Sequence, residues 1–302
     1  MSAQPRPAED EVVLITGVTA GLGRELARAL AADDATVLVH GRDAARGQAA
    51  VGELSRETGN DRLAFYGADL ASLAAVQALA ERLSAERERL TVLVNNAGVG
   101  RGAPGAARQL SGDGYELRFA VNYLAPVLLT RLLVPLLVRG APARVVNVAS
   151  AAQAAIDFDD PMLATGYDGG RAYAQSKLAL VMFTFDLACE LEGTDVIVNC
   201  LHPATRMPTQ MTREACVASK DSLASGLRAT LRLALGNVAD TGRYYEGPRE
   251  ARAHPQADDP DARRQLRQLT GQLLSAVGSD APTAGGAAAA AAPVQGDGGG
   301  AR

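Results

Sequence analysis

The sequence predicts an α/β fold, in which a doubly wound parallel β-sheet is flanked by helices within a single domain. Strand-length apolar runs alternate with longer segments of helical pattern along most of the 302 residues. Within several runs the apolar residues occupy consecutive positions, as expected for strands covered on both faces. The composition, with 47% hydrophobic and 21% charged residues, is that of a folded globular protein. Repeated alternation of strand and helix indicates right-handed parallel units that share one sheet.

The predicted elements follow one another in strict alternation. The expected strands occupy Val12–Thr16, Thr36–His40, Leu63–Gly67, Thr91–Asn95, Arg144–Ala149 and Val196–Leu201. The helical patterns between them cover Gly23–Ala32, Ala44–Thr58, Leu73–Arg89, Tyr115–Arg139 and Arg171–Glu192. A last short run, Gly242–Glu246, predicts an edge strand.

The two ends of the chain differ in composition from the middle. Residues 1–10 are polar and Pro-rich, which predicts a flexible leader. Residues 279–302 consist mostly of Ala, Gly and Pro and cannot bury enough apolar surface to offset the entropy of ordering, so we expect a disordered tail. One folded domain over 11–278 remains.

Charge and cysteine usage narrow the function. There are 30 Lys and Arg against 34 Asp and Glu, a net charge of −4, so no basic surface for nucleic acid is expected. Three cysteines without a CxxC spacing and three scattered histidines predict no metal site and fit a cytoplasmic, reducing compartment. The apolar stretch Val121–Val138 is interrupted by Asn122, Pro126 and Arg131, which predicts a buried helix rather than a membrane span.

A glycine-rich loop follows the first predicted strand and precedes a helix. In Thr-Gly-Val-Thr-Ala-Gly-Leu-Gly (16–23), Gly17 permits a backbone turn that other residues resist. Gly21 lets the backbone approach a pyrophosphate, and Gly23 lets the helix pack on the strand. The N–H groups at the helix N-terminus then face the phosphates. This context predicts a dinucleotide site.

The end of the second strand indicates which dinucleotide is bound. Gly41 stands where an acidic residue would receive a ribose 2′-hydroxyl, and Arg42 follows at once. An arginine there suits a 2′-phosphate, so NADP(H) is favoured and NAD(H) remains the alternative. Asp43 weakens this argument, because it would either cap the next helix or pair with Arg42.

Polar residues at the ends of later strands predict a catalytic site, because ligands of open parallel sheets bind there. Ser150 follows the fifth strand, and Tyr173 and Lys177 stand four residues apart on one face of a long predicted helix. We expect Lys177 and an oxidised nicotinamide to lower the pKa of Tyr173 from about 10 toward neutrality, where the phenol can exchange a proton with a substrate oxygen.

With these residues in place, the chain resembles the short-chain dehydrogenase/reductase family over about residues 11–250. The resemblance is carried by TGVTAGLG (16–23), NNAG (95–98), Asn122 in VNYLAP, Ser150 and YAQSK (173–177). It implies a Rossmann-like fold in which Tyr173 is the general acid/base, Ser150 polarises the substrate carbonyl, Lys177 holds the nicotinamide ribose and Asn122 supports a water-linked proton relay.

The resemblance also implies the residues that contact the cofactor. Asp69 is the expected adenine contact, and Asn95 the support at the centre of the sheet. The full implied set is Gly17, Thr19, Gly21, Leu22, Gly23, Arg42, Asp69, Leu70, Asn96, Ala97, Gly98, Tyr173, Lys177, Pro203 and Thr205.

Two departures from the family pattern concern the substrate side. Ser150 and Tyr173 lie 23 positions apart, so residues 151–170 are expected to form an inserted loop over the site, as in the branch similar to retinol dehydrogenases and WW-domain oxidoreductases. After the sixth strand, Ala204 replaces the usual glycine, which leaves Thr205 or Thr209 to contact the carboxamide. His202, just before Pro203, is interpreted as structural.

The leading hypothesis is an NADP(H)-dependent oxidoreductase that interconverts an alcohol and a ketone or aldehyde of an apolar small molecule, as a carbonyl reductase or a retinol dehydrogenase-like enzyme does. The alternatives are a non-catalytic dinucleotide-binding sensor or scaffold, and an epimerase or dehydratase with tightly held NAD. The sequence also suggests a lid over 206–226. Helices 115–139 and 171–192 have apolar faces beyond what the sheet needs, and the resemblance implies that they form a dimer interface, so a homodimer or homotetramer is expected, with no membrane partner.

Overall fold

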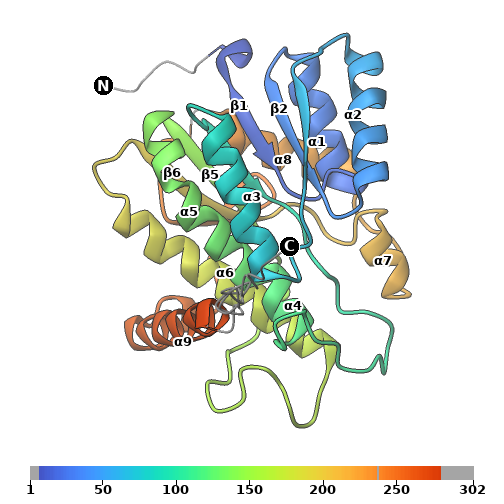
Figure 1. Cartoon of the computed structure of the whole chain (residues 1–302). Helices are drawn as coiled ribbons and strands as arrows, with labels where there is room; N and C mark the ends of the chain where they lie inside the picture. Colours follow the sequence, from blue (N-terminus) through green and yellow to red (C-terminus); the bar gives the residue numbers. More distant parts are fainter. Residues whose placement is uncertain (1–6, 237, 280–302) are drawn as a thin grey trace, which may run out of the picture.

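One mixed sheet forms the centre of the computed structural model, which describes residues 7–236 and 238–279 (Figure 1). The strand order is β3-β2-β1-β4-β5-β6-β7-β8, with all neighbours parallel except β7 and β8. The strands are β1 (Val12–Ile15), β2 (Thr36–Gly41), β3 (Leu63–Gly67), β4 (Val92–Asn95), β5 (Ala143–Val148), β6 (Val196–His202), β7 (Arg243–Glu246) and β8 (Arg249–Glu250). The order reverses between β1 and β4, which places a crevice at the carboxyl ends of these strands. The predicted fold class is confirmed.

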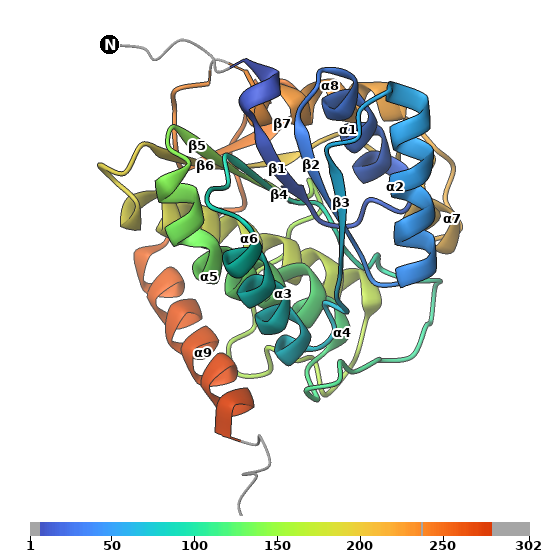
Figure 2. The same ribbon diagram turned by 45° about the horizontal axis from the view of Figure 1, so that its top comes forward.

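Helices cover both faces of the sheet (Figure 2). On one face lie α1 (Gly21–Ala32), α2 (Ala44–Thr58) and α8 (Leu223–Ala234). On the other lie α3 (Leu73–Glu86), α5 (Ala125–Arg139), α6 (Gly169–Glu190) and α9 (Pro260–Ser279), with the short helices α4 (Leu117–Phe119) and α7 (Gln210–Glu214) near the strand ends. The central strands are buried by both layers, which explains their unbroken apolar runs.

The helix predicted over Tyr115–Arg139 is not continuous. It consists of α4, a π-helical turn at Ala120–Leu124, and α5. Such turns widen a helix locally and are frequent at functional sites, and this one carries Asn122, which is fully buried. The segment Leu117–Arg139 is long and apolar enough to span a membrane by composition, but 67% of its apolar window is buried in the fold, as in a core helix.

The strand predicted over Gly242–Glu246 forms as β7, but it is not the edge of the sheet. The two-residue strand β8 pairs with β7 through Tyr245↔Glu250 and Glu246↔Arg249. The predicted leader also differs in part, since Ala8–Asp10 form a 3-10 turn. Arg62 and Arg89 donate hydrogen bonds to the carbonyl oxygens of this turn. The rest of the leader, residues 1–6, and the predicted tail beyond Ser279 lie outside the described residues.

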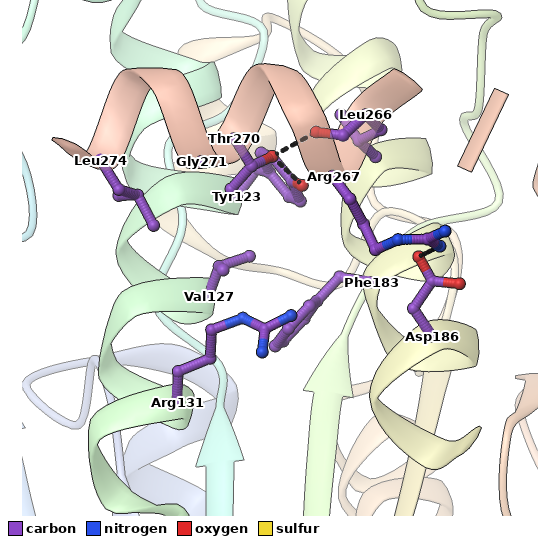
Figure 3. Close-up of a pocket in the computed structure, with 10 residues that line it drawn as sticks. All are labelled: Tyr123, Val127, Arg131, Phe183, Asp186, Leu266, Arg267, Thr270, Gly271 and Leu274. Atoms are coloured by element: carbon purple, nitrogen blue, oxygen red, sulfur yellow. Dashed lines mark hydrogen bonds and ion pairs between the residues drawn. The ribbon is translucent and has the colours of Figure 1, made fainter. Parts of the chain in front are cut away.

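The C-terminal helix α9 was missing from the sequence prediction. It packs beside α5 and α6, with Leu266 buried in the same core cluster (Figure 3). Tyr123 shares a 2.6 Å hydroxyl–hydroxyl hydrogen bond with Thr270, and Arg267 donates to Asp186 at 2.6 Å. A cavity of about 220 Å³ remains between the three helices.

The position of α9 changes the argument for a dimer interface. The apolar faces of α5 and α6 were expected to be free for a second subunit, but α9 of the same chain covers part of them. Association into a homodimer or homotetramer therefore stays a prediction, and the apolar faces of α5 and α6 no longer support it.

Candidate active site

The loop between β1 and α1 forms a cradle that only glycine permits. Gly17 and Gly21 have φ of 75° and 61°, in the left-handed region. A Cβ at Gly23 would lie 2.3 Å from the carbonyl oxygen of Gly17, so the start of α1 rests directly on the loop backbone. The N-cap of α1 is Ala20, which has no side-chain acceptor for the first N–H groups of the helix. The loop therefore fits the phosphates of a dinucleotide.

The NNAG segment after β4 is fixed to this loop through Thr16. The Thr16 hydroxyl accepts hydrogen bonds from the backbone N–H groups of Asn96 (2.9 Å) and Ala97 (3.0 Å). In return, Asn96 Nδ2 donates to the carbonyl oxygens of Thr16 and Gly17. The predicted cofactor residues of the two segments therefore lie side by side, and Thr16 is a positioning residue that the sequence interpretation did not single out.

His40 is a second positioning residue that was not predicted. Its Nδ1 accepts the N–H of Gly17 at 3.3 Å, so Nε2 carries the proton and donates to the carbonyl oxygen of Ala68 at 3.2 Å. Burial lowers the pKa of His40 to about 4 and keeps the ring neutral. The ring joins the glycine loop to the segment that contains Asp69, the predicted adenine contact. The signal for His40 was present, since it is a histidine inside an apolar strand.

Asp43 caps the next helix rather than pairing with Arg42. Its carboxylate accepts the N–H of Arg46 at 2.9 Å and caps α2, while Arg42 beside it is exposed. Asp69 is exposed too, with one carboxylate oxygen on the N–H of Ala71. Arg42 and Asp69 thus lie at the carboxyl ends of the neighbouring strands β2 and β3, where adenosine of a dinucleotide is expected.

Other predicted cofactor residues line the same crevice or support it. The methyl group of Thr19 would lie 2.9 Å from a Cβ at Gly41, and Ala97 is in contact with Gly17. The side chains of Leu22 and Leu70 are instead buried in the two hydrophobic clusters, so only their backbones are free to contact a cofactor.

The four predicted catalytic residues converge at the ends of β4 and β5. Lys177 is buried and its Nζ donates to the carbonyl oxygen of Val148, the last residue of β5, at 2.7 Å. The same Nζ lies 5.9 Å from the ring centroid of Tyr173, one turn earlier on α6. A Cβ at Gly98, the last residue of NNAG, would lie 3.0 Å from Asn122 Oδ1 and 3.6 Å from Lys177 Nζ. The motifs that follow one another in the sequence therefore come together in the folded structure.

Burial raises the pKa of the Tyr173 phenol above its ordinary value, and the Ser150 hydroxyl lowers it by a smaller amount. Burial also lowers the pKa of Lys177 to about 8. Burial is thus the larger effect on the phenol of the chain by itself, and the lowering expected from Lys177 together with an oxidised nicotinamide stays a prediction.

Ser150 is held from two sides. Its Oγ accepts the backbone N–H of Ala152 at 3.1 Å. Its carbonyl oxygen accepts hydrogen bonds from Gln153 Nε2 (3.0 Å) and the Tyr244 hydroxyl (3.2 Å). The hydroxyl thus has a fixed position and keeps its own proton for donation.

The Asn122 side chain joins the site to its surroundings. Its Oδ1 accepts the N–H of Val99 at 2.8 Å, and its Nδ2 donates to the carbonyl oxygen of Val99 and to Ser176 Oγ, both at 3.0 Å. Ser176 Oγ donates in turn to the carbonyl oxygen of Tyr173 at 2.8 Å. Asn122 therefore positions both the NNAG loop and α6, and the proton relay stays a prediction.

The segment after β6 lies against the cofactor crevice. Thr205 Oγ1 is 3.1 Å from His202 Nε2, and its N–H donates to Asp221 at 2.7 Å. The Thr209 methyl group would lie 3.3 Å from a Cβ at Gly21, and Met211 contacts Gly100 on the opposite side. The predicted lid therefore bridges the glycine loop and the loop after NNAG. Pro203, which precedes this segment, is buried.

His202 makes the structural contact expected of it, and burial lowers its pKa. Within residues 7–236 and 238–279, no group of three or more His, Cys, Asp or Glu side chains could hold a metal ion.

These features define a dinucleotide-binding oxidoreductase with a serine, tyrosine and lysine site. The short chain dehydrogenase family profile matches residues 11–218. Human retinol dehydrogenase 13 is 33% identical over 293 residues, which cover 90% of this chain and 86% of that protein. Mouse retinol dehydrogenase 14 is 36% identical over 287 residues, covering 86% and 84%. The chain belongs to the short-chain dehydrogenase/reductase family, whose members act on CH–OH donors.

Solved structures agree with this assignment. A protein from Mycobacterium paratuberculosis has a TM-score of 0.72 and 27% identity, covering 90% of this chain and 98% of that one. The Pseudomonas aeruginosa RhlG/NADP active-site complex has a TM-score of 0.66 and 28% identity, covering 80% and 97%. A nicotinamide dinucleotide is therefore the cofactor class of this fold and site.

Proposed function

We propose that this enzyme uses NADP(H) to interconvert an alcohol and a ketone or aldehyde of an apolar small molecule, with Tyr173 as the general acid/base. The observation that carries the proposal is the convergence of Ser150, Tyr173, Lys177 and Asn122 beside Gly98 and the glycine loop.

The proton chemistry follows from the surroundings of each group. Burial favours the neutral phenol of Tyr173, which can therefore give its proton to the oxygen of a carbonyl substrate. Ser150 can donate to the same oxygen, because the acceptor side of its hydroxyl already holds the N–H of Ala152. When bound, the nicotinamide ring supplies or accepts the hydride. Lys177, anchored on Val148, is placed to hold the nicotinamide ribose.

The preference for NADP(H) depends on Arg42. This side chain is exposed at the end of β2 and follows Gly41, where no carboxylate stands to repel a 2′-phosphate. Asp43 is engaged at the start of α2 and does not replace the missing acid. The NADP complex of the similar RhlG structure supports the same cofactor. We expect Arg42→Ala to weaken NADPH binding about tenfold or more and to leave NADH binding nearly unchanged, since only NADPH carries the 2′-phosphate.

The substrate class is inferred from relatives and from the insertion. The similar retinol dehydrogenases are named for an apolar alcohol. The insertion 151–170 follows Ser150 directly in the sequence and is expected to shape the substrate site.

Tyr173→Phe tests the function. The variant retains the ring and loses the ionisable hydroxyl, so NADPH should bind with unchanged affinity while turnover falls by at least 10²-fold. Activity is measured with NADPH on decanal, benzaldehyde and all-trans-retinal, and with NADP⁺ on the matching alcohols. Binding of NADPH without turnover by the wild-type protein on any of these would favour the sensor instead.

A further inference from the structure

A buried guanidinium lies beside the proposed substrate site and takes no part in the chemistry above. Arg118 is 2% exposed and belongs to α4, four residues before Asn122. Its charge is balanced by Glu116, equally buried, at 3.2 Å. Buried charges are rare unless paired and hydrogen-bonded, and a pair of this kind is weak evidence for stability alone. The contacts of Arg118 with neighbouring segments therefore indicate its role.

Arg118 joins segments that are far apart in the sequence. Nε donates to the carbonyl oxygen of Gly100 at 2.9 Å, and Nη2 donates to that of Arg101 at 3.2 Å. Nη1 donates to the hydroxyl of Tyr167 at 2.6 Å. The guanidinium thus binds the loop that follows NNAG with one edge and the end of the insertion with another.

Glu116 completes the cluster. Its Oε1 accepts hydrogen bonds from both Arg118 and the Tyr167 hydroxyl (3.1 Å), and its Oε2 caps α4 by accepting the N–H of Phe119, the last residue of that helix. The Tyr167 hydroxyl therefore accepts from the guanidinium and donates to the carboxylate. Removing this hydroxyl breaks both links between the insertion and α4 without leaving a charge unpaired.

Two glycines show how closely the segments approach. A Cβ at Gly169 would lie 2.3 Å from the carbonyl oxygen of Arg101, and one at Gly102 would lie 3.0 Å from Arg118 Nη2. The loop 99–102 and the segment 167–169 are therefore packed backbone to backbone around the guanidinium. Gly100 also contacts Met211 of the predicted lid, so the loop 99–102, the insertion and this segment meet here.

The other end of the insertion is fixed independently. Gln256, in the 3-10 helix Pro255–Ala257, accepts the N–H of Ile156 at 2.7 Å and donates to its carbonyl oxygen at 3.2 Å. Gln175 of α6 donates to the carbonyl oxygen of Pro161. With these anchors in place, the cluster at Tyr167 closes the remaining end of the insertion.

We propose that Arg118 is a positioning residue for substrate binding: with Glu116 and Tyr167 it holds the loop 99–102 and the insertion 151–170 as one wall of the substrate site. This inference rests on the proposed function. Because Asn122 follows Arg118 by four residues and Tyr173 follows Tyr167 by six, the same cluster keeps the wall in register with the catalytic groups. A wall held in this way selects substrates by size, since loosening it alters the fit of a bulky substrate more than that of a small one.

Tyr167→Phe is the test, and Tyr123→Phe is its matched control. Both variants lose one tyrosine hydroxyl, but that of Tyr123 bonds Thr270 on the α9 side. With saturating NADPH, we expect Tyr167→Phe to raise KM for all-trans-retinal about tenfold and KM for benzaldehyde less than threefold, with NADPH affinity unchanged. A loss of folded protein lowers kcat equally for both aldehydes and leaves both KM values unchanged. Tyr123→Phe should leave the ratio of the two KM values as in the wild type.

Hydrogen exchange tests the cluster without turnover. In Tyr167→Phe the backbone amides of 99–112 and of 157–168 should exchange about tenfold faster together, while α1 to α3 are unaffected. Faster exchange in 157–168 alone, or an unchanged KM ratio in an active enzyme, would overturn the proposal. If the wild-type protein reduced no aldehyde, the proposed function would fail, and coupled exchange of the two segments would still decide whether Arg118 links them.

Discussion

Replacement of Gly23 by alanine is the sharpest test of how the glycine loop works. The new Cβ would lie 2.3 Å from the carbonyl oxygen of Gly17 and 2.6 Å from Asn96 Nδ2, where ordinary contacts begin at 3.4 Å. Both neighbours are held in place, Gly17 by the backbone bond to His40 and Asn96 by its bonds to Thr16. The overlap of more than 1 Å must therefore be relieved by moving the loop itself.

The expected magnitude combines two opposing effects. Overpacking of this kind costs about 1–3 kcal/mol, and alanine gains about 1 kcal/mol over glycine inside a helix. The net loss of stability should be about 1 kcal/mol, whereas the loss of binding is larger because the moved backbone is the part that faces the phosphates. We expect the Kd for NADPH to rise about 100-fold, which corresponds to about 2.7 kcal/mol.

Gly52→Ala is the control, because a Cβ at this exposed position of α2 meets nothing within 4 Å. It should stabilise the protein by about 1 kcal/mol and leave NADPH binding unchanged. Binding is measured by NADPH fluorescence and stability by denaturant unfolding. A Gly23→Ala protein that binds NADPH within threefold of the wild type would refute the cradle argument.

Three further results are expected. His40 has a pKa of about 6.5 in the unfolded chain and about 4 in the folded one, so the free energy of unfolding should fall by about 2 kcal/mol from pH 7 to pH 4.5. Denaturant unfolding at the two pH values measures this loss. In His40→Gln the part of the pH dependence that comes from His40 should disappear. Lys177 loses its charge as pH rises through about 8, so NADPH affinity should weaken from pH 7 to pH 9, and an unchanged Kd would contradict the role of the cation. Asp186→Asn weakens the ion pairs that Arg263 and Arg267 of α9 make with Asp186. Because Arg267 is partly exposed to solvent, the expected loss in the free energy of unfolding, measured with urea, is only about 1 kcal/mol. NADPH affinity should not change.

The sheet and the glycine loop could be predicted because their signals are local. An apolar run of strand length, a glycine whose turn needs a positive φ and a helix start lie within about twenty residues of one another. The catalytic cluster was also predictable, since strand ends of a parallel sheet meet at one edge whatever the loops between them do.

The C-terminal helix carried a signal that was not used. Leu266, Leu269, Leu273 and Leu274 follow a helical spacing after Pro260, which is a favourable first helical residue. This amphipathic pattern predicts a helix that packs on the fold, and such a helix covers part of the apolar faces of α5 and α6.

The cluster around Arg118 could not be derived from local pattern. Arg118 lies 49 residues from Tyr167, and nothing near either residue shows that they meet. A charged residue in an otherwise apolar helix usually indicates a solvated face. Only the folded structure shows that Glu116 and three further hydrogen-bond acceptors make burial of this charge possible.

The electrostatics of Tyr173 depend on burial, which residue types alone do not show. Lys177 together with an oxidised nicotinamide is expected to lower the pKa of the phenol, whereas burial raises the pKa of Tyr173 and lowers that of Lys177. The chain therefore keeps Tyr173 protonated near neutral pH, which is the state needed to give a proton to a carbonyl oxygen. For the reverse reaction, the same site requires additional positive charge beside the phenol, whereas within residues 7–236 and 238–279 the Ser150 hydroxyl is the group that lowers the pKa of Tyr173. Reduction of a carbonyl needs a protonated Tyr173, whereas oxidation of an alcohol needs its phenolate. The described part of the chain by itself favours the protonated form.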